Sequence, residues 1–276
     1  MSVVCVPNIS EGRDRRQLQR LVTAAGPSLL DLHFDPDHNR SVFSLGGTSL
    51  YEDLCRLAWV VARDLDISRH SGVHPRLGAL DVVPFVPLLP SDTDEAERLT
   101  AQFEEFLDKE LSVPVFRYDQ GVSLPEVRRR AFKSLTPTAG PSTPHQHLGA
   151  TALACRPPLV AYNILVDAPT PLEPRSLVLA LRSPIVRTLG FHVAKGYQLS
   201  TNLISPTLYG PYQLFKDVKK YGFRPLECEL VGLLPSQVLA TIPLELYEVL
   251  NVNSWSTFEA RLSLPPGHNY EHGLPS

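Results

Sequence analysis

Two histidines, two arginines and an aspartate occur within thirteen residues of this chain, in the segment SRHSGVHPRLGALDVVPFVP at residues 68–87. They are Arg69, His70, His74, Arg76 and Asp81. A histidine with a pKa near neutrality can act as a general acid or base at cellular pH. Arginines can hold carboxylates through paired hydrogen bonds, and an aspartate can orient an imidazole. The segment therefore predicts an active-site loop with His74 as its proton-transfer residue.

Glycine and proline shape this segment. Gly72, Pro75 and Gly78 interrupt any helix, so the segment is predicted to be a loop that runs from a helix into a strand. Loops at the ends of regular elements often position catalytic groups. The alternative is a surface loop with two structural histidines.

A second histidine pair keeps a metal site open. His145 and His147 lie in a Pro-, Thr- and Ser-rich stretch at residues 133–149, which by composition is a linker. With His70 and His74 they would form a His-rich site. However, an HxxxH pair shares one face only on a helix, and none is expected there.

Two further polar segments follow predicted strands. Asn8 lies in CVPNISEGR, residues 5–13, where Ser10 could simply cap a helix. Asn39 and Arg40 lie in the turn DPDHNRSV, residues 35–42, and either reach a ligand or only complete the turn.

Hydrophobic periodicity predicts the elements that position these residues. In the first half, strands are expected at residues 3–7, 28–34, 40–45, 81–86 and 113–118, and helices at 13–25, 48–66 and 92–111. In the second half, strands are expected at 159–166, 189–194, 198–204 and 225–233, and helices at 171–182, 209–221 and 236–250. Both halves contain the order β-α-β-β-α-β. This predicts an α+β fold of two ferredoxin-like units side by side, with a ligand cleft or tunnel between them.

Composition narrows the class of protein. The net charge is -3 without a run of Lys or Arg, which argues against nucleic-acid binding. The four cysteines are scattered, as expected of reduced thiols in the cytoplasm. Apolar runs are strand-length, and neither a signal peptide nor a membrane span is expected.

Six segments together resemble the formiminotransferase domain family, as found in glutamate formimidoyltransferase and in formimidoyltransferase-cyclodeaminase. They are CVPNISEGR at residues 5–13, NRSVFSLGG at 39–47, SRHSGVHPRLGALDVVPFVP at 68–87, GPSTPHQHLGA at 140–150, LSTNL at 199–203 and ELVGLLP at 229–235. The segments occur in the family's order through nearly the whole chain, and the third is highly specific.

The resemblance implies a domain organisation and a set of site residues. Residues 1–152 are expected to form the N-terminal subdomain, 153–264 the C-terminal subdomain and 265–276 a flexible tail. His74 is the implied catalytic residue. Asn8, Arg40, Arg69 and Arg76 are expected to bind substrate. The implied folate-binding loop comprises Gly140, Pro141, Ser142, Thr143, Pro144, His145, Gln146, His147, Leu148 and Gly149.

The resemblance also implies a reaction. A cytoplasmic homodimer is expected to move a formimino or formyl group from N-formimino-L-glutamate to N5 of tetrahydrofolate, within histidine catabolism and one-carbon metabolism. Tetrahydrofolate serves as the co-substrate, and no metal is required. The stretch at residues 181–193 is shorter than in the family, so a folate-binding relative without transfer activity is the alternative. A His-rich metal-dependent hydrolase is the third possibility.

Overall fold

The computed structural model describes residues 2–118, 120–167 and 173–265. The chain divides into two compact units, the first formed by the described part of Met1–Pro157 and the second by that of Pro158–Leu264. The expected tail lies outside the described residues except for Pro265. The subdomain boundary expected after residue 152 stays a prediction.

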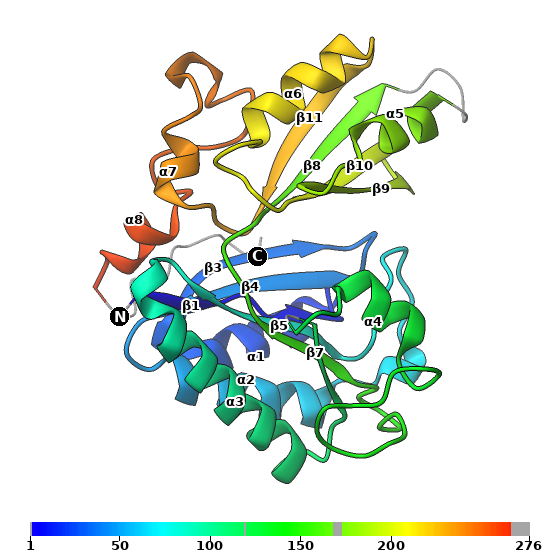
Figure 1. Ribbon diagram of the computed structural model, residues 1–276, viewed down its shortest axis with the longest axis vertical. Coiled ribbons are helices and arrows are strands. Elements are labelled where there is room, and N and C mark those ends of the chain that lie inside the picture. The colour runs from blue at the N-terminus through cyan, green and yellow to red at the C-terminus, as the bar shows by residue number, and fades with distance from the viewer. Residues whose placement is uncertain (1, 119, 168–172, 266–276) are drawn as a thin grey trace. The chain divides into compact units, whose positions relative to one another are not determined.

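One mixed sheet forms the centre of the first unit (Figure 1). Its seven strands within the described residues are β1 (Val3–Cys5), β2 (Asn8–Ile9), β3 (Leu29–Asp35), β4 (Arg40–Gly46), β5 (Leu80–Pro87), β6 (Val115–Arg117) and β7 (Thr151–Cys155). Both β1 and β2 pair antiparallel with β4 on one side and β5 on the other. β3 extends the sheet beyond β4, and β7 and β6 extend it in parallel beyond β5.

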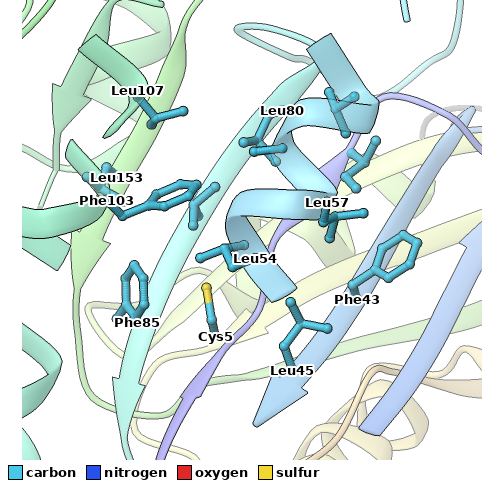
Figure 2. Close-up of a cluster of buried hydrophobic side chains, with 14 of the residues drawn as sticks. Cys5, Phe43, Leu45, Leu54, Leu57, Leu80, Phe85, Phe103, Leu107 and Leu153 are labelled. Carbon is cyan, nitrogen blue, oxygen red and sulfur yellow. The ribbon is translucent and has the colours of Figure 1, made fainter. Parts of the chain in front are cut away.

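Three helices cover one face of this sheet: α1 (Arg15–Ala25), α2 (Leu50–Asp64) and α3 (Thr93–Lys109). Their apolar residues recur at helical spacing, so each helix turns one stripe toward the strands. Figure 2 shows Leu54 and Leu57 of α2 and Phe103 of α3 beside Phe43 and Phe85 of the strands. This apolar layer is larger than the buried group on the other face of the sheet.

The short helix α4 (Leu124–Arg130) packs on the opposite face. Val127 belongs to a separate buried group that includes Val82 of β5 and Phe116 of β6. Ser123 starts the helix, and its backbone N–H donates to the Glu126 carboxylate at 2.9 Å. This capping contact fixes the orientation from which α4 presents its arginines.

A β-bulge in β5 changes which face its side chains reach. Asn8 is opposite Val82 and Ile9 is opposite Leu80, so Asp81 is the extra residue on β5. With strict alternation Asp81 would share the helix-covered face with Val83. The bulge instead turns its carboxylate toward the side of α4, and bulges often re-aim a side chain in this way.

The second unit has four described strands in the order β11-β8-β10-β9, all paired antiparallel. They are β8 (Val160–Asp167), β9 (Val186–Val193), β10 (Gly196–Leu203) and β11 (Arg224–Val231). Helices α5 (Glu173–Leu181) and α6 (Pro211–Lys220) pack on this sheet through one shared apolar core (Figure 1). Two shorter helices follow, α7 (Ser236–Leu239) and α8 (Phe258–Leu262).

The α+β class and the β-α-β-β-α-β order of both halves are confirmed. The helix expected at residues 236–250 is largely wrong, because it is reduced to α7 and a 3-10 turn at Leu244–Leu246 that directly follows Pro243. The helix expected at 171–182 begins outside the described residues. No helix in the described ranges has the length and apolar character needed to span a bilayer. The ligand cleft stays a prediction.

Candidate active site

Asn39 joins three of the segments that the sequence singled out. Its Oδ1 accepts from the Gly12 backbone N–H at 2.9 Å, and its Nδ2 donates to the Ser71 carbonyl at 3.0 Å. Its own carbonyl oxygen accepts from Nε2 of His70 at 2.7 Å. Asn39 has φ +47°, a left-handed conformation that asparagine tolerates better than most residues. Residues 5–13, 35–42 and 68–87 therefore meet around one side chain.

Gly72 allows the His74 loop to approach the β3–β4 turn. A Cβ atom built on Gly72 would collide with the carbonyl oxygen of His38. Only glycine can bring the two backbones this close without displacing one of them. The result is that the His38 and His74 rings meet edge to face, with their centroids 5.7 Å apart.

A hydrogen bond at Nδ1 fixes the tautomer of the His74 imidazole. Its Nδ1 lies 2.8 Å from the carbonyl oxygen of Pro75, so Nδ1 carries the hydrogen and donates it. The NH1 group of Arg40 lies 3.5 Å from the same nitrogen and, being a donor itself, acts there as a nearby positive charge. In this tautomer Nε2 has a lone pair and can accept a proton.

Asp81 binds two arginines with one carboxylate. Its side chain is fully buried, and its Oδ2 accepts from Arg40 at 2.5 Å and from Arg128 of α4 at 2.7 Å. Its Oδ1 accepts from the Leu77 backbone N–H at 2.5 Å. The sequence suggested that Asp81 orients an imidazole, whereas this carboxylate anchors two guanidinium groups and the backbone of Leu77 in the loop before β5. We call Asn8, Arg40, His74, Asp81 and Arg128 the Asp81 cluster.

The electrostatics of the Asp81 cluster keep His74 neutral. Burial, together with the charges of Arg40 and Arg128, lowers the pKa of His74 to about 2, although Asp81 acts in the opposite direction. Burial alone would raise the pKa of Asp81, but Arg128 and Arg40 hold that pKa below its ordinary value. Near neutral pH the cluster therefore contains a neutral imidazole, an ionised carboxylate and two cations.

Two of the four other residues predicted to bind substrate belong to this cluster. The Oδ1 of Asn8 accepts from NH2 of Arg40 at 2.5 Å, which places both side chains beside Asp81. Arg76 directs its guanidinium at its own loop, donating to the carbonyl oxygens of Gly72 at 2.6 Å and His74 at 2.7 Å. Arg69 lies outside the cluster.

Arg69 and Arg76 consequently differ in what they can do. The Arg69 side chain is 88% exposed and its nearest acidic group is Asp66, at 3.6 Å. Arg76 supports the backbone on both sides of Val73, so it shapes the loop that carries His74. A role in substrate binding stays a prediction for both arginines.

The loop at residues 140–149 docks directly on the His74 segment. The Ala79 backbone N–H donates to the Leu148 carbonyl at 2.9 Å, and the Ile67 N–H donates to the His147 carbonyl at 2.8 Å. The imidazole of His147 lies 3.2 Å from the Asp66 carboxylate. The predicted folate-binding loop and the predicted catalytic loop are therefore neighbours within the first unit.

The tip of this loop is open, whereas its second end is fixed. Residues 141–144 are exposed, and Leu148 and Gly149 are buried. The Nδ1 of His145 accepts from the backbone N–H groups of His147 and Leu148 at 3.2 and 3.1 Å. Its imidazole thus organises the turn, which explains one of the two histidines without a metal.

Sequence analysis missed two members of this region, Arg128 and His38. Arg128 lies in the run RRR and its partner Asp81 is 47 residues away, so no local signal distinguishes it from its neighbours. His38 lies in the turn that was singled out, and its buried ring could have been suspected from its place next to Asn39. In the part of the chain that the structure describes, no three His, Cys, Asp or Glu side chains are grouped as a metal ion would need.

Comparison with protein families decides the assignment. Residues 2–156 match the formiminotransferase domain, N-terminal subdomain. The chain belongs to the formiminotransferase family. Among its relatives, the glutamate formimidoyltransferase of Streptococcus pyogenes serotype M1 is 30% identical over 272 residues, which cover 87% of this chain and 91% of the relative.

Two further relatives come from other organisms. The glutamate formimidoyltransferase of Thermoplasma acidophilum is 31% identical over 277 residues, which cover 88% of this chain and 91% of the relative. The formimidoyltransferase-cyclodeaminase of Sus scrofa is 31% identical over 277 residues, covering 86% of the chain and 51% of the relative. The family inferred from the sequence motifs is confirmed.

Proposed function

We propose that this chain is a glutamate formimidoyltransferase, which moves the formimino group of N-formimino-L-glutamate to N5 of tetrahydrofolate. The names of two relatives that the chain matches over 91% of their length support this activity. The single structural observation that carries the proposal is the geometry of His74. Its Nδ1 donates to the Pro75 carbonyl, so in this tautomer Nε2 carries the lone pair that can accept a proton.

The chemistry requires one proton to move between two nitrogen atoms. N5 of tetrahydrofolate attacks the formimino carbon, and a tetrahedral intermediate forms. N5 loses its proton as the new C–N bond forms, and the α-nitrogen of glutamate gains a proton as the old C–N bond breaks. His74 Nε2 accepts the first proton and delivers the second. General acid–base catalysis of this kind contributes roughly 10²–10⁴-fold.

Substrate binding follows from the same region. The loop at residues 140–149 supplies exposed side chains and docks on the segment that carries His74, and we assign it to the reduced folate. Arg40, steadied by Asn8 and Asp81, is a cation beside His74 and can hold a carboxylate. Fixing both substrates against one imidazole adds the advantage of proximity.

Assembly and location belong to the same proposal. All four cysteines lie in the described residues and carry free thiols, which supports a reducing compartment such as the cytoplasm. We also propose a homodimer, which the family resemblance implies. Light scattering on the purified chain tests this: a mass close to 30.6 kDa would contradict it, and twice that mass would support it.

The decisive experiment measures formimino transfer by mass spectrometry of the folate product. We expect the wild-type chain to turn over, and His74→Ala to lower kcat by roughly 10²–10⁴-fold while folate binding is retained. His192→Ala is the matched control, because it removes an exposed imidazole on β9 of the second unit. Unchanged turnover in His74→Ala would refute its catalytic role.

Two measurements on the wild-type chain test the alternative functions, a folate-binding relative and a metal-dependent hydrolase. Calorimetric folate binding without any transfer would favour a folate-binding relative that lacks the activity. Elemental analysis provides the third outcome, since a stoichiometric transition metal in active protein would favour a metal-dependent hydrolase.

A further inference from the structure

The charges of the Asp81 cluster do not balance. Oδ2 of Asp81 accepts from both Arg40 and Arg128, whose side chains are only 16% and 17% exposed. Two positive charges therefore surround one negative charge in a largely desolvated place. A surplus charge in such a place is costly unless an anion completes it.

Arg128 has donors that the protein does not use. A guanidinium group offers five N–H donors. Among the described residues, the hydrogen bonds of Arg128 consist of the one to Asp81, and its buried Nε has no partner. Arg40 and Arg128 meet at a single oxygen, so their bonded nitrogens are no farther apart than the sum of 2.5 and 2.7 Å. Two such groups at this separation suit a carboxylate.

The position of this pair next to His74 indicates which carboxylate fits. In N-formimino-L-glutamate the α-carboxylate is attached to the same carbon as the nitrogen that leaves. His74 has to deliver a proton to that nitrogen, so the α-carboxylate must lie near the imidazole. NH1 of Arg40 is 3.5 Å from Nδ1 of His74, which places the cationic pair close to the imidazole. The γ-carboxylate is farther from the reacting nitrogen than the α-carboxylate by two carbon atoms, Cβ and Cγ.

We propose that Arg128, together with Arg40, binds the α-carboxylate of the one-carbon donor, with Asp81 holding both guanidinium groups in place. This assignment rests on the proposed function, because it takes its ligand from the proposed donor. It makes Arg128 a substrate-binding residue, while Asp81 is a positioning residue.

The test uses an inert analogue of the donor and the full chain. N-formyl-L-glutamate carries both carboxylates, and N-formyl-L-isoglutamine has an amide in place of the α-carboxylate. We expect the wild-type chain to bind the acid at least about tenfold more tightly than the α-amide in calorimetry. Arg128→Gln is expected to lose roughly 10- to 100-fold in affinity for the acid and little for the α-amide, since one charge-assisted contact is removed.

Arg129→Gln is the matched control, because it removes the same charge from the next position of α4, where the side chain is exposed. We expect it to bind both analogues as the wild type does. Equal affinity of Arg128→Gln and wild type for the acid, or equal losses for the acid and the α-amide, would overturn the assignment. If Arg128→Gln does not fold, the assignment is tested with the wild type, which must bind N-formyl-L-glutamate more tightly than the α-amide. Arg128→Lys then provides a variant that keeps the positive charge.

Turnover separates this inference from the proposed function. Wild-type transfer with an unchanged donor KM in Arg128→Gln would refute the inference alone. A raised donor KM with an unchanged folate KM would support it. A wild type that neither transfers the formimino group nor binds N-formyl-L-glutamate would refute both.

Discussion

The low pKa of His74 makes the free energy of unfolding of the first unit depend on pH. The folded state binds fewer protons at His74 than the unfolded state does, because the pKa falls from 6.5 to about 2 on folding. Stability therefore rises with pH and is lost as the pH falls below the unfolded pKa. His74→Gln removes this titrating group and should remove its share of the acid sensitivity.

The size of the effect follows from the unfolded pKa alone, provided the folded imidazole stays neutral. Protonating the unfolded histidine, with a pKa of about 6.5, stabilises the unfolded state by about 2 kcal/mol at about pH 5 and by almost nothing at about pH 8. We therefore expect the wild type to lose about 2 kcal/mol more than His74→Gln between these two pH values.

Tryptophan fluorescence can follow the unfolding of the first structural unit separately from that of the second. The chain has two tryptophans, Trp59 on α2 of the first unit and Trp255 in the second. In a Trp255→Phe background, urea unfolding followed through Trp59 reports the first unit. A difference between wild type and His74→Gln that is the same at both pH values would refute the electrostatic description of the site.

The same reasoning extends to ligand binding. The groups that act on His74 are Arg40, Arg128 and Asp81, and the His38 ring lies against its edge. An anion bound to the two arginines would cancel their surplus charge and raise the pKa of His74, which makes Nε2 a stronger base when the donor is present. NMR titration with and without N-formyl-L-glutamate should show this rise, and an unchanged pKa would contradict it.

Three further outcomes are expected. Asp81→Asn should lower the free energy of unfolding by about 3–5 kcal/mol in urea denaturation, because two largely buried guanidinium groups lose their counter-ion; a loss below about 1 kcal/mol would contradict this. Gly78→Ala should weaken folate binding in calorimetry, because the new Cβ would collide with the Leu148 carbonyl and push the 140–149 loop away. Arg69→Ala should leave the donor KM unchanged in the transfer assay, since its side chain is 88% exposed and outside the Asp81 cluster.

The sequence predicts the elements whose signal is local. In the long helices α2 and α3, apolar residues recur at helical spacing along the sequence. The strands of the second unit are predicted from short apolar runs between turns. Strand β2 has two residues and exists only because β4 and β5 hold it on both sides. Strand β7, Thr151–Cys155, is likewise defined by its parallel partners β5 and β6 rather than by its own pattern.

The site was predictable in its loops but not in its ion pairs. His74 could be selected because it lies in a loop shaped by Gly72, Pro75 and Gly78, and Arg40 because it ends a polar turn between two predicted strands. Their electrostatic partners could not, because Arg40 and Arg128 reach Asp81 across 41 and 47 residues of sequence. The strand order and the position of α4 bring these charges together, and neither can be obtained from spacing along the chain.

Because of the bulge at Asp81, the chemistry of this site depends on the number of residues in strand β5. Leu80 and Val83 reach the same apolar layer although an odd number of steps separates them, so the strand changes phase between them. Deleting one residue between them would remove the bulge, and with it either Asp81 itself or Val82, which belongs to the buried group beneath α4. Anyone transplanting β5 into another sheet would need to carry the insertion along with the side chain. A short insertion or deletion in this strand is thus a more severe mutation than most substitutions within it.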